Sequence, residues 1–261
     1  MPQVATLASR QLDDYDSHHP GILFSEGLAL DVQQGYELQN AVAELRCQRG
    51  ERLIGYKVGC TSSAIQEQLK ITHRVRGFLF DTEQHESGVV LSHQSFASLA
   101  IEGELAIELS REPSEEDFTD HLLPACISRV FPVIELHNHV IRGQQASAGE
   151  LIANNAIHAG FVSGAGGLLS NHFSETIFDE ARLEIFQDNQ LLGQCEGRLL
   201  LETIRSSLEW LWRELLQSND RLRAGQFVLT GSIPSLFPVT GGCCLRVESV
   251  PFGEVVAEVK D

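Results

Sequence analysis

The sequence predicts an α+β protein, with a helical N-terminal region over residues 1–50 and a β-rich body over residues 51–261. Apolar residues recur at helical spacing in two early stretches, 2–14 and 33–49. From residue 51 onward, short apolar or alternating runs bounded by glycines predominate, which is the pattern of strands. Strands and helices that follow one another without regular alternation are typical of the α+β class. We expect both regions to form one structural unit.

The composition is that of a folded globular protein. The 261 residues suit one large domain, or one domain with a smaller extension, and either can bury a sizeable core. The net charge is −17 and no Lys/Arg cluster occurs, so we expect neither a nucleic-acid nor a membrane partner. There is no signal-peptide pattern and no run long enough to span a bilayer. The six cysteines form no C-x-x-C pair and suggest reduced thiols in a cytoplasmic protein.

Helical spacing and capping residues predict five helices. They are expected at 2–14, 33–49, 62–71, 114–125 and 199–219. The last is the longest, and its apolar stripe consists of Leu200, Ile204, Leu208, Leu211 and Leu215.

Alternating or continuous apolar runs predict the strands. They are expected at 52–60, 77–81, 88–92, 99–109, 129–136, in a hairpin at 181–197 that turns at Asp188-Asn189, and at 225–233 and 243–260. The stretch 149–166 reads as a loop and a strand punctuated by glycines.

The strand expected at 99–109 carries carboxylates on one face. Strand alternation directs Glu102, Glu104 and Glu108 to the same side, while the opposite side is apolar apart from Gly103. A glycine between two glutamates would let a neighbouring segment pack closely. Such a face either lies in water or holds a cation.

A third carboxylate makes a metal site conceivable. Glu135 ends an apolar run, where an unpaired charge is costly. If it met Glu102 and Glu104, the three oxygen ligands would suit a hard divalent ion, Mg²⁺ or Mn²⁺. The alternative is that Glu102 and Glu104 face solvent and Glu135 lies at a strand end. Spacing alone favours that alternative.

Lys57 and Ser232 are candidates for binding an anion. Lys57 lies between Gly55 and Gly59 on one strand face, which leaves room for a ligand carboxylate or for a lysine of altered pKa. An ordinary strand lysine with its tip in water explains the pattern equally well. Ser232 follows a strand in a turn-rich loop whose N–H groups could bind an anion, although a surface turn is the simpler interpretation. No P-loop and no Gly-x-Ser-x-Gly motif occurs.

Two histidines follow the third glutamate. If the strand continues beyond Glu135, His137 and His139 share its face and could offer nitrogen ligands to a softer metal. We instead expect at least one of them to line a pocket as a proton-transfer or orienting group without ligating the metal. The alternative is that the strand ends at Glu135 and both histidines lie in an exposed turn.

Four segments occur here in the order known from one family. They read "ERLIGYKVGCTSSAIQEQL", "IEGELAIEL", "FPVIEL" and "AGQFVLTGSI". With them, the chain resembles the hydratase and decarboxylase branch of the fumarylacetoacetate hydrolase superfamily, from about residue 30 to its end. The resemblance implies a mixed β-roll of the fumarylacetoacetate hydrolase C-terminal-domain type with a helical N-terminal region. It also implies a homo-oligomer.

The resemblance further implies a site and a reaction. Glu102, Glu104 and Glu135 would be the Mg²⁺ or Mn²⁺ ligands and Lys57 the pocket lysine. Asn155 and Ser232 fall in segments that contact substrate in the family. The implied activity is the addition of water to a 2-hydroxydienoate, the enol form of a 2-oxo acid. The alternatives are decarboxylation of a 4-oxalocrotonate-type acid on the same scaffold, or a non-catalytic metal- or ligand-binding paralogue.

The chain departs from the family pattern around these residues. It has Asn154 and Ile157 where the family often has Asp and Ser. His137 and His139 stand in a segment that often reads Ile-Val-Asp-Ser-Arg in the family, and Glu202-Thr203-Ile204 replaces Gly-His-Pro. The lost acid and hydroxyl favour the paralogue, whereas the retained glutamates and Lys57 oppose it.

Overall fold

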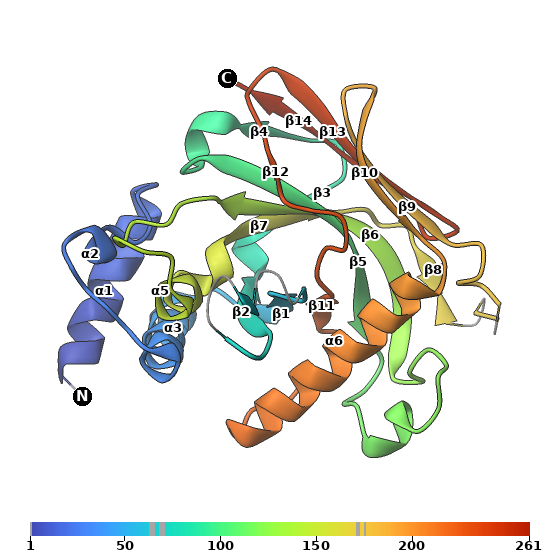
Figure 1. The fold of residues 1–261 in the computed structure, drawn as a ribbon, viewed down its shortest axis with the longest axis horizontal. Coiled ribbons are helices and arrows are strands. Elements are labelled where there is room, and N and C mark those ends of the chain that lie inside the picture. Colours follow the sequence, from blue (N-terminus) through green and yellow to red (C-terminus); the bar gives the residue numbers. More distant parts are fainter. Residues whose placement is uncertain (1, 63–65, 68–70, 171–172, 175) are drawn as a thin grey trace.

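Two β-sheets form the centre of the molecule, and helices cover its sides (Figure 1). This computed structural model describes residues 2–62, 66–67, 71–170, 173–174 and 176–261. Helices and a β-rich body occur together, so the predicted α+β class is confirmed. The helix expected at 62–71 falls mostly on residues outside those described.

Within the described residues, the larger sheet has nine strands. Its order is β2-β1-β11-β5-β6-β7-β3, with β12 paired to β5 and β8 paired to β6. These strands are β1 (Leu53–Gly59), β2 (Val75–Phe80), β3 (Gln84–Glu86), β5 (Leu99–Leu109), β6 (Ile127–Asn138), β7 (His158–Ser163), β8 (Leu168–Leu169), β11 (Phe227–Leu229) and β12 (Phe237–Pro238). Because β5 and β6 are the longest strands and lie next to each other, they form the scaffold on which the other strands are arranged.

In the part of the chain that the structure describes, the smaller sheet has five strands in the order β10-β9-β13-β14-β4. They are β4 (Val89–Ser92), β9 (Arg182–Gln187), β10 (Gln190–Glu196), β13 (Cys243–Val250) and β14 (Gly253–Lys260). The predicted hairpin at 181–197 is confirmed as β9 and β10, and the C-terminal strands are β13 and β14.

Helices gather on one side of the larger sheet and along its lower edge in Figure 1. They are α1 (Pro2–Asp16), α2 (Ile22–Ser25), α3 (Val32–Gln48), α5 (Ala148–Ala153) and α6 (Arg198–Gln217). The predicted stripe of α6, from Leu200 to Leu215, is buried along its whole length. Helix α5 was missed because it is short and its sequence contains a glycine.

The helix predicted at 114–125 is wrong. This segment contains only the 3₁₀ turn η3 (Glu115–Phe118). The Asp117 carboxylate accepts hydrogen bonds from the backbone N–H groups of Ser114 and Cys126, and Arg111 forms an ion pair with it. These bonds close the segment into a tight loop, which a continuous helix could not do.

The main hydrophobic core lies between the two sheets. On β5, the apolar alternation predicted from the sequence supplies it, with Ile101, Leu105 and Ile107 buried in one cluster. Gly103 shares this face, and a Cβ there would lie 2.5 Å from Cγ1 of Ile185 on the smaller sheet. The glycine is therefore required by the close approach of the two sheets, as the sequence suggested.

The N-terminal helices are joined to the body by a buried ionic network. Arg46 of α3 lies 2.5 Å from Glu51 and 2.8 Å from Glu83, and all three side chains are buried. Its guanidinium also stacks over Phe80 at 3.9 Å. Since Glu83 follows β2, this network fixes α3 against the larger sheet.

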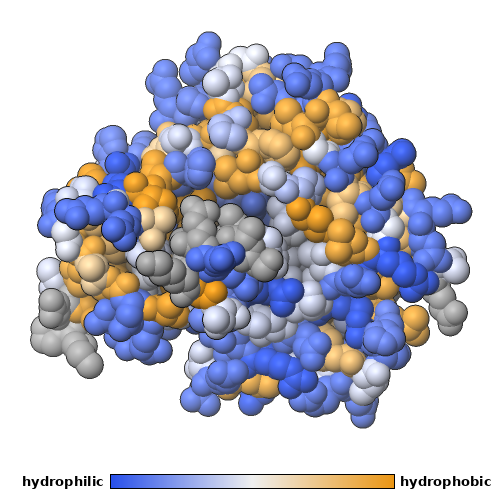
Figure 2. All heavy atoms as spheres, in the orientation of Figure 1, coloured by the Kyte–Doolittle hydropathy of each residue, from blue (hydrophilic) through white to orange (hydrophobic). Residues whose placement is uncertain are grey.

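Hydrophilic residues lie around most of the outline of the face drawn in Figure 2, with hydrophobic ones scattered between them. Among the described residues, no helix combines the length and the apolar character that a membrane crossing requires. All six cysteines are free thiols.

Candidate active site

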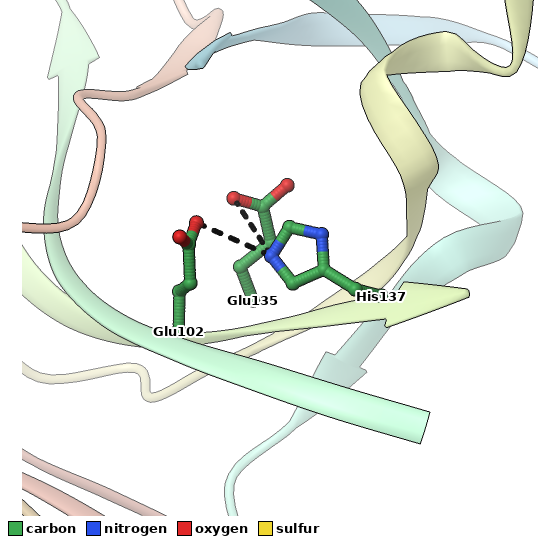
Figure 3. A group of neighbouring side chains, drawn as sticks. All are labelled: Glu102, Glu135 and His137. Atoms are coloured by element: carbon green, nitrogen blue, oxygen red, sulfur yellow. Dashed lines mark ion pairs between the residues drawn. The ribbon is translucent and has the colours of Figure 1, made fainter. Parts of the chain in front are cut away.

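The pairing of β5 with β6 brings the predicted acidic residues together. Glu102 lies directly opposite Glu135, and Ala100 lies opposite His137. Paired residues project from the same face of a sheet. Glu102, Glu135 and His137 therefore point into one space (Figure 3). Strand β6 continues to Asn138, so the condition under which His137 shares the face of Glu135 is met.

The ligand atoms of these three residues lie within 4.8 Å of one another. Nε2 of His137 is 3.3 Å from Oε2 of Glu102 and 3.7 Å from Oε2 of Glu135. The imidazole thus occupies the point between the two carboxylates. Within the described part of the chain, this is the group of side chains whose geometry suits a metal ion.

Glu104 lies beside this group, on the same face of β5. Its Oε2 accepts a hydrogen bond from the backbone N–H of Gly231, and its Oε1 has no protein partner among the described residues. Burial raises the pKa of Glu104 well above its usual range, and the nearby Glu135 and Glu102 carboxylates raise it further. The side chain of Glu104 is therefore close to the metal-type group without being one of its three members.

Lys57 is the positive charge that faces these carboxylates. Its Nζ lies 3.2 Å from Oε1 of Glu135 and donates a hydrogen bond of 3.3 Å to the carbonyl of Ala156. Burial disfavours the ammonium, but the carboxylates of Glu135 and Glu102 outweigh burial and hold the pKa of Lys57 above its usual value. Lys57 is therefore charged at neutral pH.

The two glycines beside Lys57 have different structural roles. A Cβ at Gly59 would lie 3.4 Å from Nζ, so this glycine leaves space beside the ammonium, as predicted. A Cβ at Gly55 would lie 2.1 Å from the carbonyl oxygen of Phe227. The expected recess at Gly55 is therefore absent, because the β11 backbone fills it.

His158 is a site residue that the sequence analysis missed. Its Nδ1 lies 2.7 Å from Oε1 of Glu135, and its side chain is completely buried. His158 begins β7, and the pairing of β7 with β6 places it opposite His137. A histidine inside the apolar run of a strand was the available signal, since a buried imidazole needs a polar partner.

A cavity of about 500 Å³ opens onto this group. Lys57, Glu102, His137, His139 and Ser232 all line it. His137 is buried at its floor, whereas His139 is exposed at its rim. Ser232 donates a hydrogen bond to the carbonyl of Gly103 at 3.3 Å.

The prediction that Asn155 contacts substrate is not supported. Its side chain accepts a hydrogen bond from the N–H of Phe78 at 2.7 Å and donates one to the carbonyl of the same residue at 2.9 Å. Asn155 is directed at β2, and its neighbours Ala156 and Ile157 line the cavity instead. We therefore assign Asn155 a structural part.

The cavity also contains a thiol that is not a nucleophile. Cys60 follows β1, and burial raises its pKa to about 11, although Lys57 opposes the shift. At neutral pH the group is therefore protonated, and the thiolate is the reactive form. Thiol-based catalysis does not fit this site.

The donor set at this site fits a divalent cation. The carboxylates of Glu102 and Glu135 face one lysine, with the carboxyl of Glu104 beside them, which leaves an excess of negative charge in a mostly buried space. Glu104 Oε1 and Glu135 Oε2 are buried without a hydrogen-bond partner among the described residues. Buried anionic oxygens of this kind are costly unless a cation meets them, and carboxylates are the ligands that Mg²⁺ and Mn²⁺ prefer.

Comparison with known proteins identifies relatives with named activities. The chain is 28% identical over 209 residues to 2-keto-4-pentenoate hydratase of Paraburkholderia phymatum, covering 80% of this chain and 79% of that protein. It is 25% identical over 242 residues to 2-hydroxyhexa-2,4-dienoate hydratase of Comamonas testosteroni, covering 91% and 87%. No family model matches.

A solved structure matches almost the whole fold. This is 4-oxalocrotonate decarboxylase from Pseudomonas putida G7 with magnesium and adipate, with a TM-score of 0.85, 22% identity, and coverage of 99% of this chain and 97% of that one. The chain is thus similar in sequence to named hydratases and in fold to this decarboxylase, in agreement with the resemblance noted from the sequence to the hydratase and decarboxylase branch of the fumarylacetoacetate hydrolase superfamily.

The shared fold includes the curled larger sheet and the helical N-terminal region, which is the β-roll that the sequence resemblance implied. His137 lies between the carboxylates of Glu102 and Glu135.

Proposed function

We propose that the chain is a metal-dependent hydratase that adds water to a 2-hydroxydienoate, the enol form of a 2-oxo acid. One observation carries the proposal: the carboxyl groups of Glu102, Glu104 and Glu135 lie together with a charged lysine, and Glu102 and Lys57 of this group line a cavity. The named hydratases among the relatives support it.

Glu102, Glu104 and Glu135 would hold the cation, which we propose is Mg²⁺ or Mn²⁺. His137 lies between Glu102 and Glu135 and would orient water or substrate. When bound, the ion polarises the 2-oxo group and stabilises the negative charge that develops on its oxygen.

The charge of Lys57 suits two tasks. Its ammonium can hold the substrate carboxylate, and it can donate a proton when the dienol converts to the unsaturated ketone. His137 can accept a proton from the water that adds to the conjugated double bond. Ser232, which also lines the cavity, can donate a hydrogen bond to the substrate.

The cavity wall favours hydration over decarboxylation of a dicarboxylic acid. Among the described lining residues, Lys57 is the one Lys or Arg, and Glu135 already pairs with it. Much of the remaining wall is apolar, including Leu151, Ile157 and Leu236. A second substrate carboxylate would therefore lose its hydration without gaining a cationic partner.

The direct test is turnover of 2-hydroxypenta-2,4-dienoate by the full chain with Mg²⁺, with Mn²⁺ and with a chelator. We expect metal-dependent loss of the dienoate and a product heavier by one water molecule. Release of CO₂ from 4-oxalocrotonate, without hydration of the dienoate, would establish the decarboxylase. Metal binding without either reaction would leave the non-catalytic paralogue. Homo-oligomer formation and a cytoplasmic location remain predictions.

A further inference from the structure

The two carboxylate oxygens of Glu135 have different environments. Oε1 is contacted by Nδ1 of His158 at 2.7 Å and by Nζ of Lys57 at 3.2 Å. Oε2 has no hydrogen-bond partner among the described residues and lies 3.7 Å from Nε2 of His137. The carboxylate is therefore held through one oxygen and presents the other to the acidic group.

His158 is placed so that Glu135 is its polar partner. The side chain is fully buried, and its ring packs near that of Phe161, with 6.4 Å between centroids. Because an ionised carboxylate can only accept, Nδ1 must carry the hydrogen of this bond. The other ring nitrogen, Nε2, is buried and has no partner within the described part of the chain.

The backbone before His158 has an unusual conformation that helps to place the ring of His158 against Glu135. Asn155, Ala156 and Ile157 have φ values of 55°, 52° and 57°, in the left-handed region that a β-branched isoleucine rarely adopts. This turn brings the carbonyl of Ala156 to Lys57 and the ring of His158 to Glu135. Strained turns of this kind are maintained where the surrounding contacts depend on them.

We propose that His158 is a positioning residue for the metal site. By donating to Oε1 of Glu135, it fixes the carboxylate in the orientation that presents Oε2 to the divalent cation. Hydrogen bonds from a neighbouring side chain commonly orient metal-binding groups and tune their affinity. The inference rests on the proposed metal site, but it assigns His158 a part that none of the sequence motifs indicated.

The test compares two substitutions with different hydrogen-bonding capacity. His158→Leu removes the donor, whereas His158→Asn keeps an N–H near the position of Nδ1. Mn²⁺ affinity is measured by calorimetry on the full chain, and the electron paramagnetic resonance spectrum of bound Mn²⁺ reports its ligand geometry. We expect the leucine variant to bind Mn²⁺ at least about tenfold more weakly with an altered spectrum. We expect the asparagine variant to stay within about threefold of the wild type, because it retains the donor.

Controls separate positioning from folding. His93 is hydrogen-bonded to the carbonyl of Val239 outside the acidic group, so His93→Leu makes the same chemical change elsewhere and should leave Mn²⁺ affinity unchanged. If His158→Leu does not fold, His158→Met takes its place, because the flexible methionine side chain fills irregular space.

Two results would overturn the inference. One is wild-type Mn²⁺ affinity and spectrum in a folded leucine or methionine variant. The other is an asparagine variant as weak as the leucine or methionine variant, which would mean that the donated hydrogen bond is not what matters. Failure of the wild-type chain itself to bind Mn²⁺ would instead refute the proposed metal site, so the two failures are distinguishable.

Discussion

Nζ of Lys57 lies 3.2 Å from Oε1 of Glu135, and the two side chains are only 4% and 1% exposed. A buried ion pair of this kind is a weak source of net stability, but removing one partner leaves an uncompensated buried charge. Here the acidic side chains of Glu102 and Glu104 also lie near Lys57, on the side of Glu135. Lys57 thus compensates the charge of the carboxylates in the metal-free site, in addition to its proposed role in catalysis.

Replacing Lys57 should therefore affect both activity and stability. We expect Lys57→Met to lower kcat by at least about 100-fold, the scale of a lost proton-transfer group. It should also destabilise the metal-free protein by about 3 kcal/mol in urea unfolding, because Glu135 loses its partner. Lys260→Met, on an exposed lysine, is the matched control. Wild-type kcat per folded molecule in the Lys57 variant would show that the lysine is not catalytic.

Glu104→Gln tests the metal ligands without disturbing the fold. The amide oxygen can still accept the hydrogen bond from Gly231, while the side chain can no longer ionise to meet a cation. We expect Mg²⁺ and Mn²⁺ affinity to fall by more than about tenfold and metal-dependent turnover to be lost. Glu108→Gln is the control, because Glu108 lies on the same strand but pairs with Arg129 at 3.0 Å. Unchanged calorimetric affinity in the Glu104 variant would remove this residue from the ligand set.

The two histidines should differ in their effects. His137 is buried between Glu102 and Glu135, whereas His139 is exposed at the cavity rim. We expect His137→Ala to lower kcat by about 100-fold, and His139→Ala to leave kcat within about threefold of the wild type. Steady-state kinetics on both variants provides the comparison, each serving as the control for the other. The reverse order of effects would move the proton-transfer or orienting role to His139.

The apolar cavity wall predicts selectivity between two acids of equal length. 2-Oxohexanoate and 2-oxoadipate share the group that would meet the metal, and they differ only in whether the far end is a methyl or a carboxylate. In the presence of Mg²⁺, we expect 2-oxohexanoate to bind at least about tenfold more tightly, a difference of about 1.4 kcal/mol. Competition calorimetry measures this ratio independently of turnover. Tighter binding of 2-oxoadipate would favour a dicarboxylate substrate and the decarboxylase.

The environment of Asp117, in the 3₁₀ turn η3 outside the active site, predicts that the stability of the protein depends on pH. Burial alone would raise its pKa, but the hydrogen bonds from Arg111 and Ser114 hold the pKa below its usual value. A carboxyl whose pKa is depressed on folding stabilises the protein above its unfolded value, about 3.9, and loses this contribution as the pH falls through the folded value. We expect Asp117→Asn to cost about 1–3 kcal/mol at pH 7.

That cost should shrink below about pH 4, where the wild-type carboxyl also becomes protonated. Urea unfolding of both proteins between neutral and acidic pH measures the difference. The exposed neighbour Glu116, replaced by Gln, is the control and should change stability little at any pH. A cost that stays constant down to acidic pH would show that the ionised form of Asp117 is not what stabilises the loop.

Strand alternation predicted the most important part of the structure. The two faces of 99–109 separate as expected, with the apolar face in the core and the carboxylates on the other side. Such alternation is a local property, so it can be read from a sequence. Which partner the carboxylates meet depends on pairing with β6, and the sequence indicated that only through the family resemblance.

The features that were missed depend on contacts between distant segments. Asn155 turns toward the backbone of Phe78, 77 residues earlier in the chain, and His158 reaches Glu135 across two strands. Gly55 leaves room for a strand that arrives more than 170 residues later, at Phe227. No local pattern in the sequence reports the neighbours of these residues.

The pairing of β5 with β6 has a consequence for how the active site is acquired. Each step of one residue along these strands exchanges their two faces, so a slipped hairpin would send Glu102 and Glu135 into the core and Ile101 into the cavity. The same alternation therefore determines both hydrophobic collapse and the meeting of the carboxylates. A molecule that has folded has, in the same event, brought together the carboxylates that we propose hold the ion. In a purified sample, the fraction of chains able to bind the ion should equal the fraction that is folded, without a separate maturation step.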